Sequence, residues 1–279
     1  MYAIRPQCRS RAEPGADVLG RAEIATLMYH DVSDDVTTSG FQRRGARGYT
    51  LTRYAFARHM DEIAANSHTP SLIPDIDPAQ PGRHLLLSFD DGGTSALYVA
   101  EELAQRGWKA HFFVTTGRIG DRTFLDVNGI RHLRQCGHIV GSHSDSHPDI
   151  FRDLAFDDMV SEWRTSCDVL AQILGEECAH ASVPGGDISE EVLRSAGHAG
   201  LRTLFVSESW LRPRIIDGCW ILGRFSVKVS TSRARLRAIL QFHTWGWAQF
   251  ERRLKDVARR RMALLYREYV RRTTRTYTN

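Results

Sequence analysis

The chain has 279 residues, of which 42% are hydrophobic, so it can bury the core of one barrel-sized domain or of two smaller domains. We expect one domain with appendages. The formal charge of +4 is small and reflects arginines that crowd near the C-terminal end, so it gives no reason to expect a nucleic-acid partner.

The five cysteines show no close CxxC pairing, so they indicate neither a disulfide framework nor a zinc ribbon, and they favour a reducing compartment. Arginines and prolines occupy the first 20 residues, where a secretory signal would need an apolar stretch. No run of about eighteen apolar residues indicates a membrane span. We therefore expect a cytoplasmic protein.

The chain begins with a stretch at 1–20 that is typical of a flexible polar leader. The first candidate strand is 24–29, and a polar loop over one face of the fold is expected to follow it. A helix with apolar residues at helical spacing is expected at 52–66, before a proline-rich connection. From residue 85 onward, candidate strands at 85–89, 109–115, 138–140, 179–183, 201–206, 219–222 and 225–229 alternate with candidate helices at 94–105, 130–136, 160–174 and 189–197.

This alternation predicts an α/β fold with a parallel sheet covered by helices, closed or nearly closed into a barrel. We expect the barrel domain to span 21–230 and a basic, helical C-terminal extension to span 231–279. The extension has two interpretations. Either its apolar stripe packs on the barrel and its arginines are solvated, or the arginines contact an anionic partner such as a phosphate-bearing substrate or a membrane surface.

Polar side chains follow several of the predicted strands, at the point where each strand ends. Because the carboxyl ends of parallel strands meet at one end of a barrel, we expect these groups to converge: His30, Asp90, Asp91, His143, His147 and the turn Pro184–Gly186. Neighbouring strand residues point to opposite faces, so Asp90 and Asp91 can serve one site only if the strand ends there. Taken alone, such an Asp-Asp-Gly step is more typical of a helix cap.

His143 and His147, four residues apart, form a credible divalent-metal site when one carboxylate joins them. Imidazole and carboxylate suit zinc, and three protein ligands leave a position for water, as a catalytic zinc site requires. If Asp91 is the third ligand, Asp90 remains available as a general base. His30 could then act as the acid, and backbone N–H groups around Gly185 could stabilise an oxyanion, unless Pro184–Gly186 is a plain turn.

These residues resemble the first three motifs of the NodB-like polysaccharide deacetylases, carbohydrate esterase family 4. The family forms are TFDDG, H[ST]xxH and RxPxG, and the chain has LSFDDG at 87–92, HSDSH at 143–147 and VPGG at 183–186. The resemblance extends over 24–229 and includes FFVTTG at 112–117. It implies a distorted (β/α) barrel of about seven strands, with Asp90 as base, with Asp91, His143 and His147 as ligands of a divalent metal, most simply Zn2+, and with the Gly185 N–H as oxyanion donor.

The chain departs from the family pattern at two places. The arginine that orients the catalytic base in the family would fall at Ser182, and Arg224 is a candidate substitute on position alone. The late LxxH motif that supplies the acid has a literal match ending at His243, but in a helical-looking segment. The early strand ending Met28-Tyr29-His30 is instead similar to circularly permuted members, including poly-N-acetylglucosamine deacetylases, so we favour His30 as the acid. We expect four further residues to bind substrate or the oxyanion: Tyr29, Pro184, Gly185 and Arg224.

The expected function is therefore metal-dependent hydrolysis of the N-acetyl group of an amino sugar. We favour a small, nucleotide-linked or carrier-linked sugar, or a glycosylated metabolite. The alternatives are a polysaccharide deacetylase acting on poly-N-acetylglucosamine or chitooligosaccharide, and a non-catalytic carbohydrate-binding relative. Two histidines and a carboxylate also occur in non-haem Fe(II) oxygenases, but the alternation of strands and helices argues against that scaffold.

Overall fold

The computed structural model describes residues 18–186 and 188–250, together with six positions further along, 254, 262, 267, 268, 270 and 272. The leader expected at 1–20 lies mostly outside the described residues, as does most of the basic extension beyond residue 250. Within the described part of the chain, no helix has both the length and the apolar character needed to cross a membrane.

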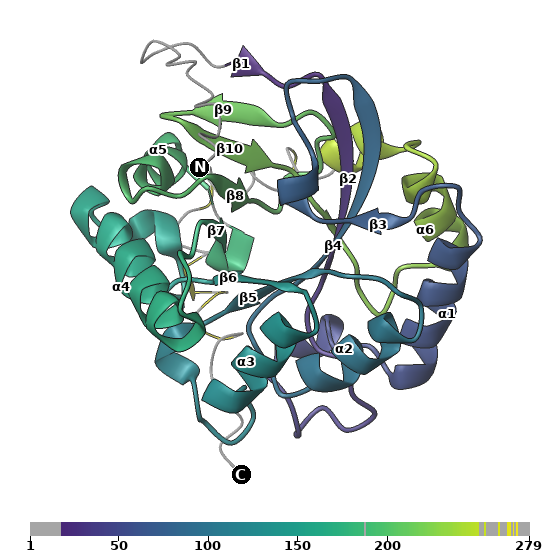
Figure 1. Ribbon diagram of the computed structural model, residues 1–279, viewed down its shortest axis with the longest axis horizontal. Helices are drawn as coiled ribbons and strands as arrows, with labels where there is room; N and C mark the ends of the chain where they lie inside the picture. Colours follow the sequence, from purple (N-terminus) through teal and green to yellow (C-terminus); the bar gives the residue numbers. More distant parts are fainter. Residues whose placement is uncertain are drawn as a thin grey trace, which may run out of the picture.

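One curled sheet forms the centre of the molecule (Figure 1). Eight of its strands run parallel in the order β10-β8-β7-β6-β5-β4-β2-β11, and β9 and β1 extend it antiparallel beyond β10, while β3 pairs with β4. The strands are β1 (Val18–Leu19), β2 (Ala22–Tyr29), β3 (Pro70–Ser71), β4 (Gly82–Phe89), β5 (His111–Val114), β6 (Ile139–Ser142), β7 (His180–Ser182), β8 (Thr203–Phe205), β9 (Arg214–Ile216), β10 (Cys219–Leu222) and β11 (Phe225–Ser226).

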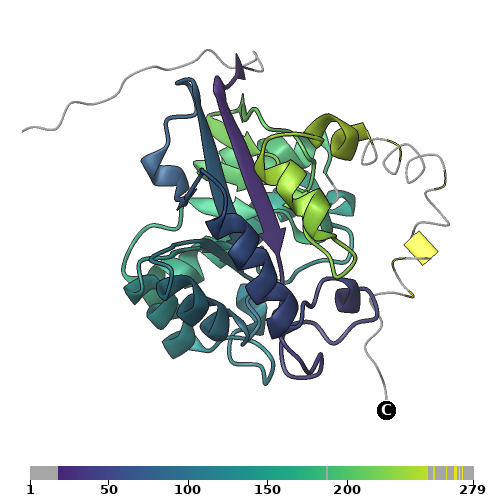
Figure 2. The same cartoon turned by 90° about the vertical axis from the view of Figure 1, so that its right-hand side faces the viewer.

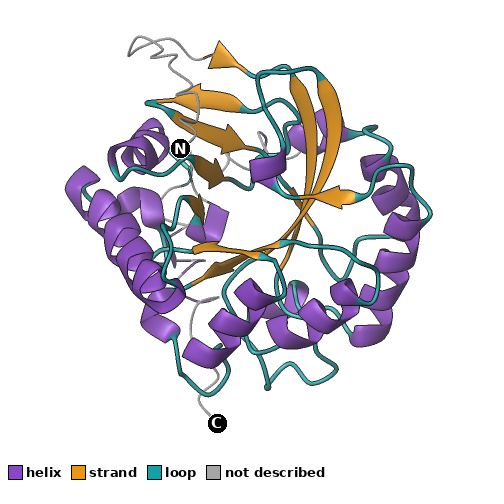
Figure 3. Cartoon of the chain, viewed as in Figure 1, coloured by secondary structure: helices purple, strands orange, loops and turns teal. Residues whose placement is uncertain are grey.

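Helices surround the curled sheet on its outside (Figure 3). They are α1 (Arg53–Ala64), α2 (Ala96–Ala104), α3 (Val127–Gln135), α4 (Phe156–Leu174), α5 (Glu190–His198) and α6 (Arg233–Leu240). Short 3-10 turns lie at Ala46–Gly48, Ile73–Asp75, Thr116–Arg118, Phe151–Asp153 and Pro184–Gly186. Side-chain caps begin several helices, because Thr52, Asp126, Ser189 and Ser232 each accept a hydrogen bond from an N–H in the first turn.

The alternation of side chains along the strands directs core residues to the two sides of the sheet, one facing the helices and one inside the curl. In β4, Leu85, Leu87 and Phe89 belong to the cluster that packs against helices, whereas Leu86 belongs to the cluster inside the sheet. In β2, Leu27 and Tyr29 likewise point to the helix side. The side chain of the residue that follows a strand therefore faces either the cavity at the strand end or the helical layer. Its position in the alternation along the strand decides which.

The predicted fold class is confirmed, including the helical segment after the last strand. The short strands β1, β3 and β9 were not predicted, because two or three residues are too few to show a period. Helix α6 lies beside α1 (Figure 2), and its Leu236, Ile239 and Leu240 join the same core cluster as the barrel.

Candidate active site

A cavity of about 500 Å³ opens where the parallel strands end. Its wall includes the residue after β2 (His30), the two residues after β4 (Asp90 and Asp91), and His143 and His147 after β6. The loop that the sequence placed over one face contributes Phe41 and Tyr49, among others. The predicted convergence of strand ends therefore exists, although it joins segments more than 100 residues apart in the chain.

The backbone turns sharply at Asp91 rather than at the glycines alone. Asp91 has φ of 77°, in the left-handed region that side chains other than glycine rarely adopt, and Gly92 follows with φ of 81°. This conformation lets both carboxylates of the pair face the cavity, which a continuing strand would prevent. The strained backbone at Asp91 thus turns the carboxylate of that residue toward the cavity.

Asp91, His143 and His147 bring one ligand atom each within 4.8 Å of one another. Oδ1 of Asp91 lies 3.3 Å from Nε2 of His143 and 3.7 Å from Nε2 of His147. Two donors that each bind zinc at about 2 Å in tetrahedral geometry lie roughly 3.3 Å apart, so these separations suit a zinc ion. The donor set and its spacing fit the metal that the motifs imply.

Two further features favour metal binding by these side chains. Nδ1 of His143 lies 2.6 Å from Oγ of Ser182 and 3.1 Å from its carbonyl oxygen, which orients the ring so that Nε2 faces Asp91. Burial lowers the pKa of His147 to about 3, so its imidazole is neutral and has a free lone pair at neutral pH. Burial raises the pKa of Asp91, but the hydrogen bond from His143 and the nearby imidazoles outweigh it and hold that pKa well below the usual range.

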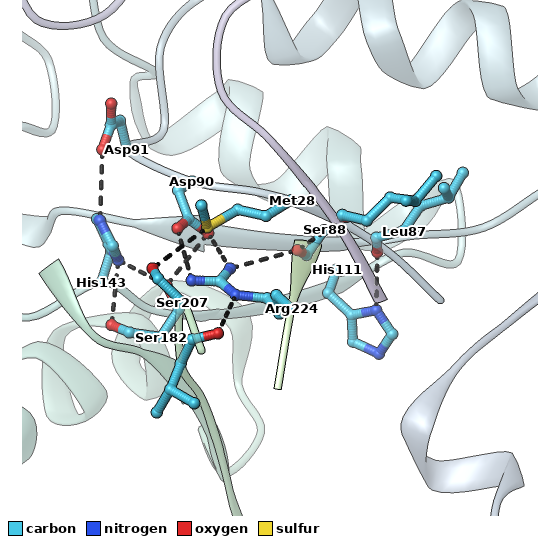
Figure 4. A network of polar contacts seen from close by, with 12 residues as sticks. Met28, Leu87, Ser88, Asp90, Asp91, His111, His143, Ser182, Ser207 and Arg224 are labelled. Atoms are coloured by element: carbon cyan, nitrogen blue, oxygen red, sulfur yellow. Dashed lines mark hydrogen bonds and ion pairs between the residues drawn. The ribbon is translucent and has the colours of Figure 1, made fainter. Parts of the chain in front are cut away.

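Arg224 forms a bidentate salt bridge with Asp90 (Figure 4). Nη1 donates to Oδ1 at 2.7 Å and Nη2 donates to Oδ2 at 2.9 Å, and the arginine is fully buried. Burial alone would raise the pKa of Asp90, but the charges of Arg224 and His143 lower it, so the carboxylate is ionised. The guanidinium that the motif lacks at Ser182 is therefore supplied by Arg224, which lies between β10 and β11.

Ser182 itself has a role that its motif position does not reveal. Its hydroxyl lies between the two halves of the site, within 3.2 Å of Oδ1 of Asp90 and 2.6 Å of Nδ1 of His143. Ser182, the last residue of β7, occupies the position of the arginine in the related motifs. Its small side chain leaves room for the Arg224 side chain, which comes from the segment between β10 and β11. Its position shortly after an apolar strand makes Arg224 a candidate substitute in the sequence, and the structure pairs Arg224 with Asp90.

His30 lines the cavity, where its ring lies 4.7 Å from that of Tyr49. Its Nδ1 has no hydrogen-bond partner among the described residues. Burial lowers the pKa of His30, and the carboxylates of Asp91 and Asp90 oppose that shift. His243, the alternative acid, is exposed three residues beyond the end of α6 and does not line the described cavity wall.

The structure corrects three of the expected substrate contacts. Tyr29 is fully buried on the helix side of β2, stacked 5.4 Å from Phe89, because the alternation that points Met28 into the cavity turns its neighbour away. Pro184 is buried and does not line the cavity, in contrast to Gly185. Arg224 is fully buried as well, so it contacts Asp90 and not a substrate.

Gly185 has φ of 62° and is exposed at the cavity wall. This conformation favours glycine, and a side chain at that position would occupy the space beside the site. The position is compatible with an N–H donor to an oxyanion.

Comparison with known proteins shows similarity to one family. Residues 77–204 match the family described as polysaccharide deacetylase. The chain is 25% identical over 227 residues to the putative polysaccharide deacetylase YxkH of Bacillus subtilis, covering 79% of this chain and 77% of that one. It is 26% identical over 163 residues to a chitooligosaccharide deacetylase of Rhizobium leguminosarum bv. trifolii, covering 52% and 67%.

The fold is also similar to solved structures. A polysaccharide deacetylase from Bacillus cereus superposes with a TM-score of 0.66 at 15% identity, covering 78% of this chain and 69% of that one. His30 and Arg224 fall outside the matched residues 77–204: His30 directly follows β2, and Arg224 lies between β10 and β11. In its motifs, its matched sequence and its fold, the chain is similar to the polysaccharide deacetylases.

Proposed function

We propose that the protein is a metal-dependent deacetylase that hydrolyses the N-acetyl group of an amino sugar. The observation that carries this proposal is one cavity in which an arginine-paired carboxylate, Asp90, lies beside the three-donor cluster of Asp91, His143 and His147. A divalent metal, most simply Zn2+, would be held by that cluster and would polarise the acetamide carbonyl and acidify the attacking water.

Each of the remaining groups has one task in the hydrolysis. Asp90 takes the proton of the attacking water. Its Oδ1 accepts from Arg224 and Ser182, whereas Oδ2 accepts from Arg224 alone among the described residues and keeps a lone pair. The N–H of Gly185 donates to the carbonyl oxygen as it gains charge. His30, protonated, gives its proton to the departing amine, so acetate and a free amine result.

The proposal also specifies the class of substrate. An N-acetylated amino sugar agrees with the similarity of the chain to a chitooligosaccharide deacetylase. A small, nucleotide-linked or carrier-linked sugar is our preferred form, and an oligomer or polymer of N-acetylglucosamine is the alternative. Acetate release from N-acetylglucosamine, its 1-phosphate and chitooligosaccharides would separate these, and activity on long polymers alone would exclude the preferred form.

The roles of Asp90 and the metal cluster are tested by paired substitutions. Asp90→Asn is expected to lower kcat by at least about 100-fold, the contribution of a general base, while metal binding persists. His143→Ala should lose both activity and metal, measured by acetate release and by metal content after dialysis. Asp168→Asn, the same change on the exposed face of α4, is the control and should behave as wild type. An active Asp90→Asn enzyme would remove Asp90 from its proposed role.

A further inference from the structure

The two histidines of the metal cluster differ in how their rings are held. Nδ1 of His143 lies within hydrogen-bond distance of Ser182, while its Nε2 faces Asp91 (Figure 4). Nδ1 of His147 is buried too, but no other residue in the described part of the chain hydrogen-bonds it. Metal-binding histidines are usually oriented through the nitrogen that does not bind the metal. The orientation of His147 therefore depends on its backbone and on packing beside Phe41, whose ring lies 4.5 Å away.

The backbone that carries His147 has an uncommon conformation. Ser144 has φ of 61° and His147 has φ of 54°, so two residues of this short turn occupy the left-handed region that favours glycine. Oγ of Ser144 accepts a hydrogen bond from the N–H of His147 at 3.0 Å. Left-handed residues other than glycine persist where the surrounding structure holds them. Contacts from outside the turn are therefore needed to keep His147 in place.

Glu162 supplies such contacts from helix α4. Its Oε2 accepts hydrogen bonds from the N–H groups of Asp145 and Ser146, at 3.0 and 2.9 Å. Its Oε1 accepts from Oγ of Ser146 at 2.6 Å. Hydrogen bonds to a carboxylate are roughly twice as strong as those between neutral groups, and Glu162 is half-buried, which limits competition from water. One carboxylate thus holds the segment that joins His143 to His147.

The other side of the same turn is held by the residues after β5. The N–H of Thr116 donates to the carbonyl oxygen of Ser144 at 3.2 Å, and Oγ1 of Thr116 donates to Oδ1 of Asp145 at 2.7 Å. These contacts end at residue 145. The contacts of Glu162 extend to Ser146, the residue directly before His147, so Glu162 holds the part of the turn next to that ligand.

We propose that Glu162 is a positioning residue of the metal site, which fixes the turn at 144–146 and thereby places the imidazole of His147 beside Asp91. The inference rests on the metal site of the proposed function and adds the residue that positions one of its ligands. Groups that support metal ligands typically change metal affinity by about 10- to 100-fold. A residue that only attached α4 to the barrel would change stability and leave the affinity for metal unchanged.

The test measures the affinity for zinc in Glu162→Ala and Glu162→Gln, by competition with a chromophoric chelator and without substrate. Glu162→Ala removes all three contacts and should weaken zinc binding by about 10- to 100-fold. Glu162→Gln keeps an oxygen for the two N–H groups and an amide donor for Oγ of Ser146, so it should restore most of the affinity. With Co2+ in place of zinc, the visible absorption of metal-saturated Glu162→Ala should differ from that of wild type, because a displaced imidazole changes the ligand geometry.

Asp168→Ala is the matched control, because it removes an exposed carboxylate from the same helix, and it should bind zinc as wild type does. Thermal unfolding of the metal-free proteins measures stability separately. If Glu162→Ala does not fold, Glu162→Asp repeats the test, since its carboxylate ends one methylene short of the turn. Wild-type zinc affinity in the folded variant, with or without a lower Tm, would overturn the proposal.

Two outcomes separate this inference from the proposed function. Zinc-dependent acetate release by a Glu162→Ala protein with wild-type zinc affinity would retain the deacetylase and reject the role of Glu162. Zinc binding that requires both His147 and Glu162, without acetate release from any N-acetylated sugar, would retain the role of Glu162 and reject the deacetylase.

Discussion

Arg224 and Asp90 are both buried, and the charge of each is neutralised by the other. An isolated charge in a protein interior costs several kcal/mol, whereas a pair with two good hydrogen bonds recovers most of that cost. Their contacts of 2.7 and 2.9 Å leave the guanidinium no freedom to rotate away from the carboxylate. The pair therefore fixes the orientation of the proposed base as well as its charge.

We expect Arg224→Met to lower the free energy of unfolding by about 3–5 kcal/mol, because it leaves the Asp90 carboxylate buried without a counterion. In an Asp90→Asn background the same substitution should cost markedly less. The measurement is a double-mutant cycle from urea unfolding curves. Equal costs in the two backgrounds would show that the contact carries no coupling energy.

The hydroxyl of Tyr29 is buried without a hydrogen-bond partner among the described residues, and its ring packs beside Phe56 and Phe89. Tyr29→Phe should therefore leave acetate release within about twofold of wild type and leave stability equal or slightly higher, since an unsatisfied polar atom is removed. Thermal unfolding and initial rates measure both. A folded but inactive Tyr29→Phe protein would show that the Tyr29 hydroxyl is needed for activity and would contradict this prediction.

At the scale of elements, the C-terminal helix α6 is attached to α1 by both apolar and ionic contacts. Glu62 of α1 is buried and pairs with Arg233 and Arg237 of α6, with Nη2 of Arg237 at 3.0 Å. The hydrogen bond from Arg237, followed by that from Arg233, overcomes the effect of burial and lowers the pKa of Glu62 from 4.5 to about 2. Arg235, between these two arginines, lines the cavity, so the attachment of α6 also shapes the cavity wall.

Glu62→Gln is expected to destabilise the protein by about 1 kcal/mol at pH 7, because its two partners are half exposed. A carboxyl whose pKa is lowered on folding contributes stability that is complete above its unfolded pKa of 4.5 and is lost as the pH falls toward 2. The difference between wild type and variant should therefore shrink over that range, measured by denaturant unfolding. Glu176→Gln, which breaks an exposed pair with Arg134, is the control and should show a smaller effect.

At the scale of the whole molecule, the proposed metal cluster joins the ends of two strands, β4 and β6, on either side of β5. A ligand that binds only the folded state stabilises it by mass action. With zinc at about 100 times its Kd, the gain is about 2.7 kcal/mol, which raises Tm by roughly 5–10 °C in a protein of this size.

This shift is measured by thermal unfolding of chelator-dialysed protein with and without zinc. His147→Ala should abolish it by removing one donor, whereas His132→Ala, at an exposed position on α3, should retain it. A zinc-induced rise in Tm that survives in His147→Ala would place the metal elsewhere.

The sequence was sufficient for the parts of the molecule that follow from local pattern. Apolar strands, helix caps and the polar residues at strand ends are local signals, so the barrel and the convergence of His30, Asp90, Asp91, His143 and His147 could be predicted. The orientation of Tyr29 could not, because one residue of register decides between cavity and helix layer. The contacts of Glu162 with the turn before His147 were also missed, since they depend on how α4 packs against that turn.

The separation of Asp90 and Arg224 by 134 residues has a consequence during synthesis of the chain. The ribosome completes β4 and the Asp-Asp turn long before it makes β10 and the arginine after it. Until then the Asp90 carboxylate has no counterion and must stay hydrated, so the strand end that carries it cannot become a dry interior. The part of the cavity around Asp90 therefore cannot reach its final form until the chain has been made at least as far as Arg224, directly before β11.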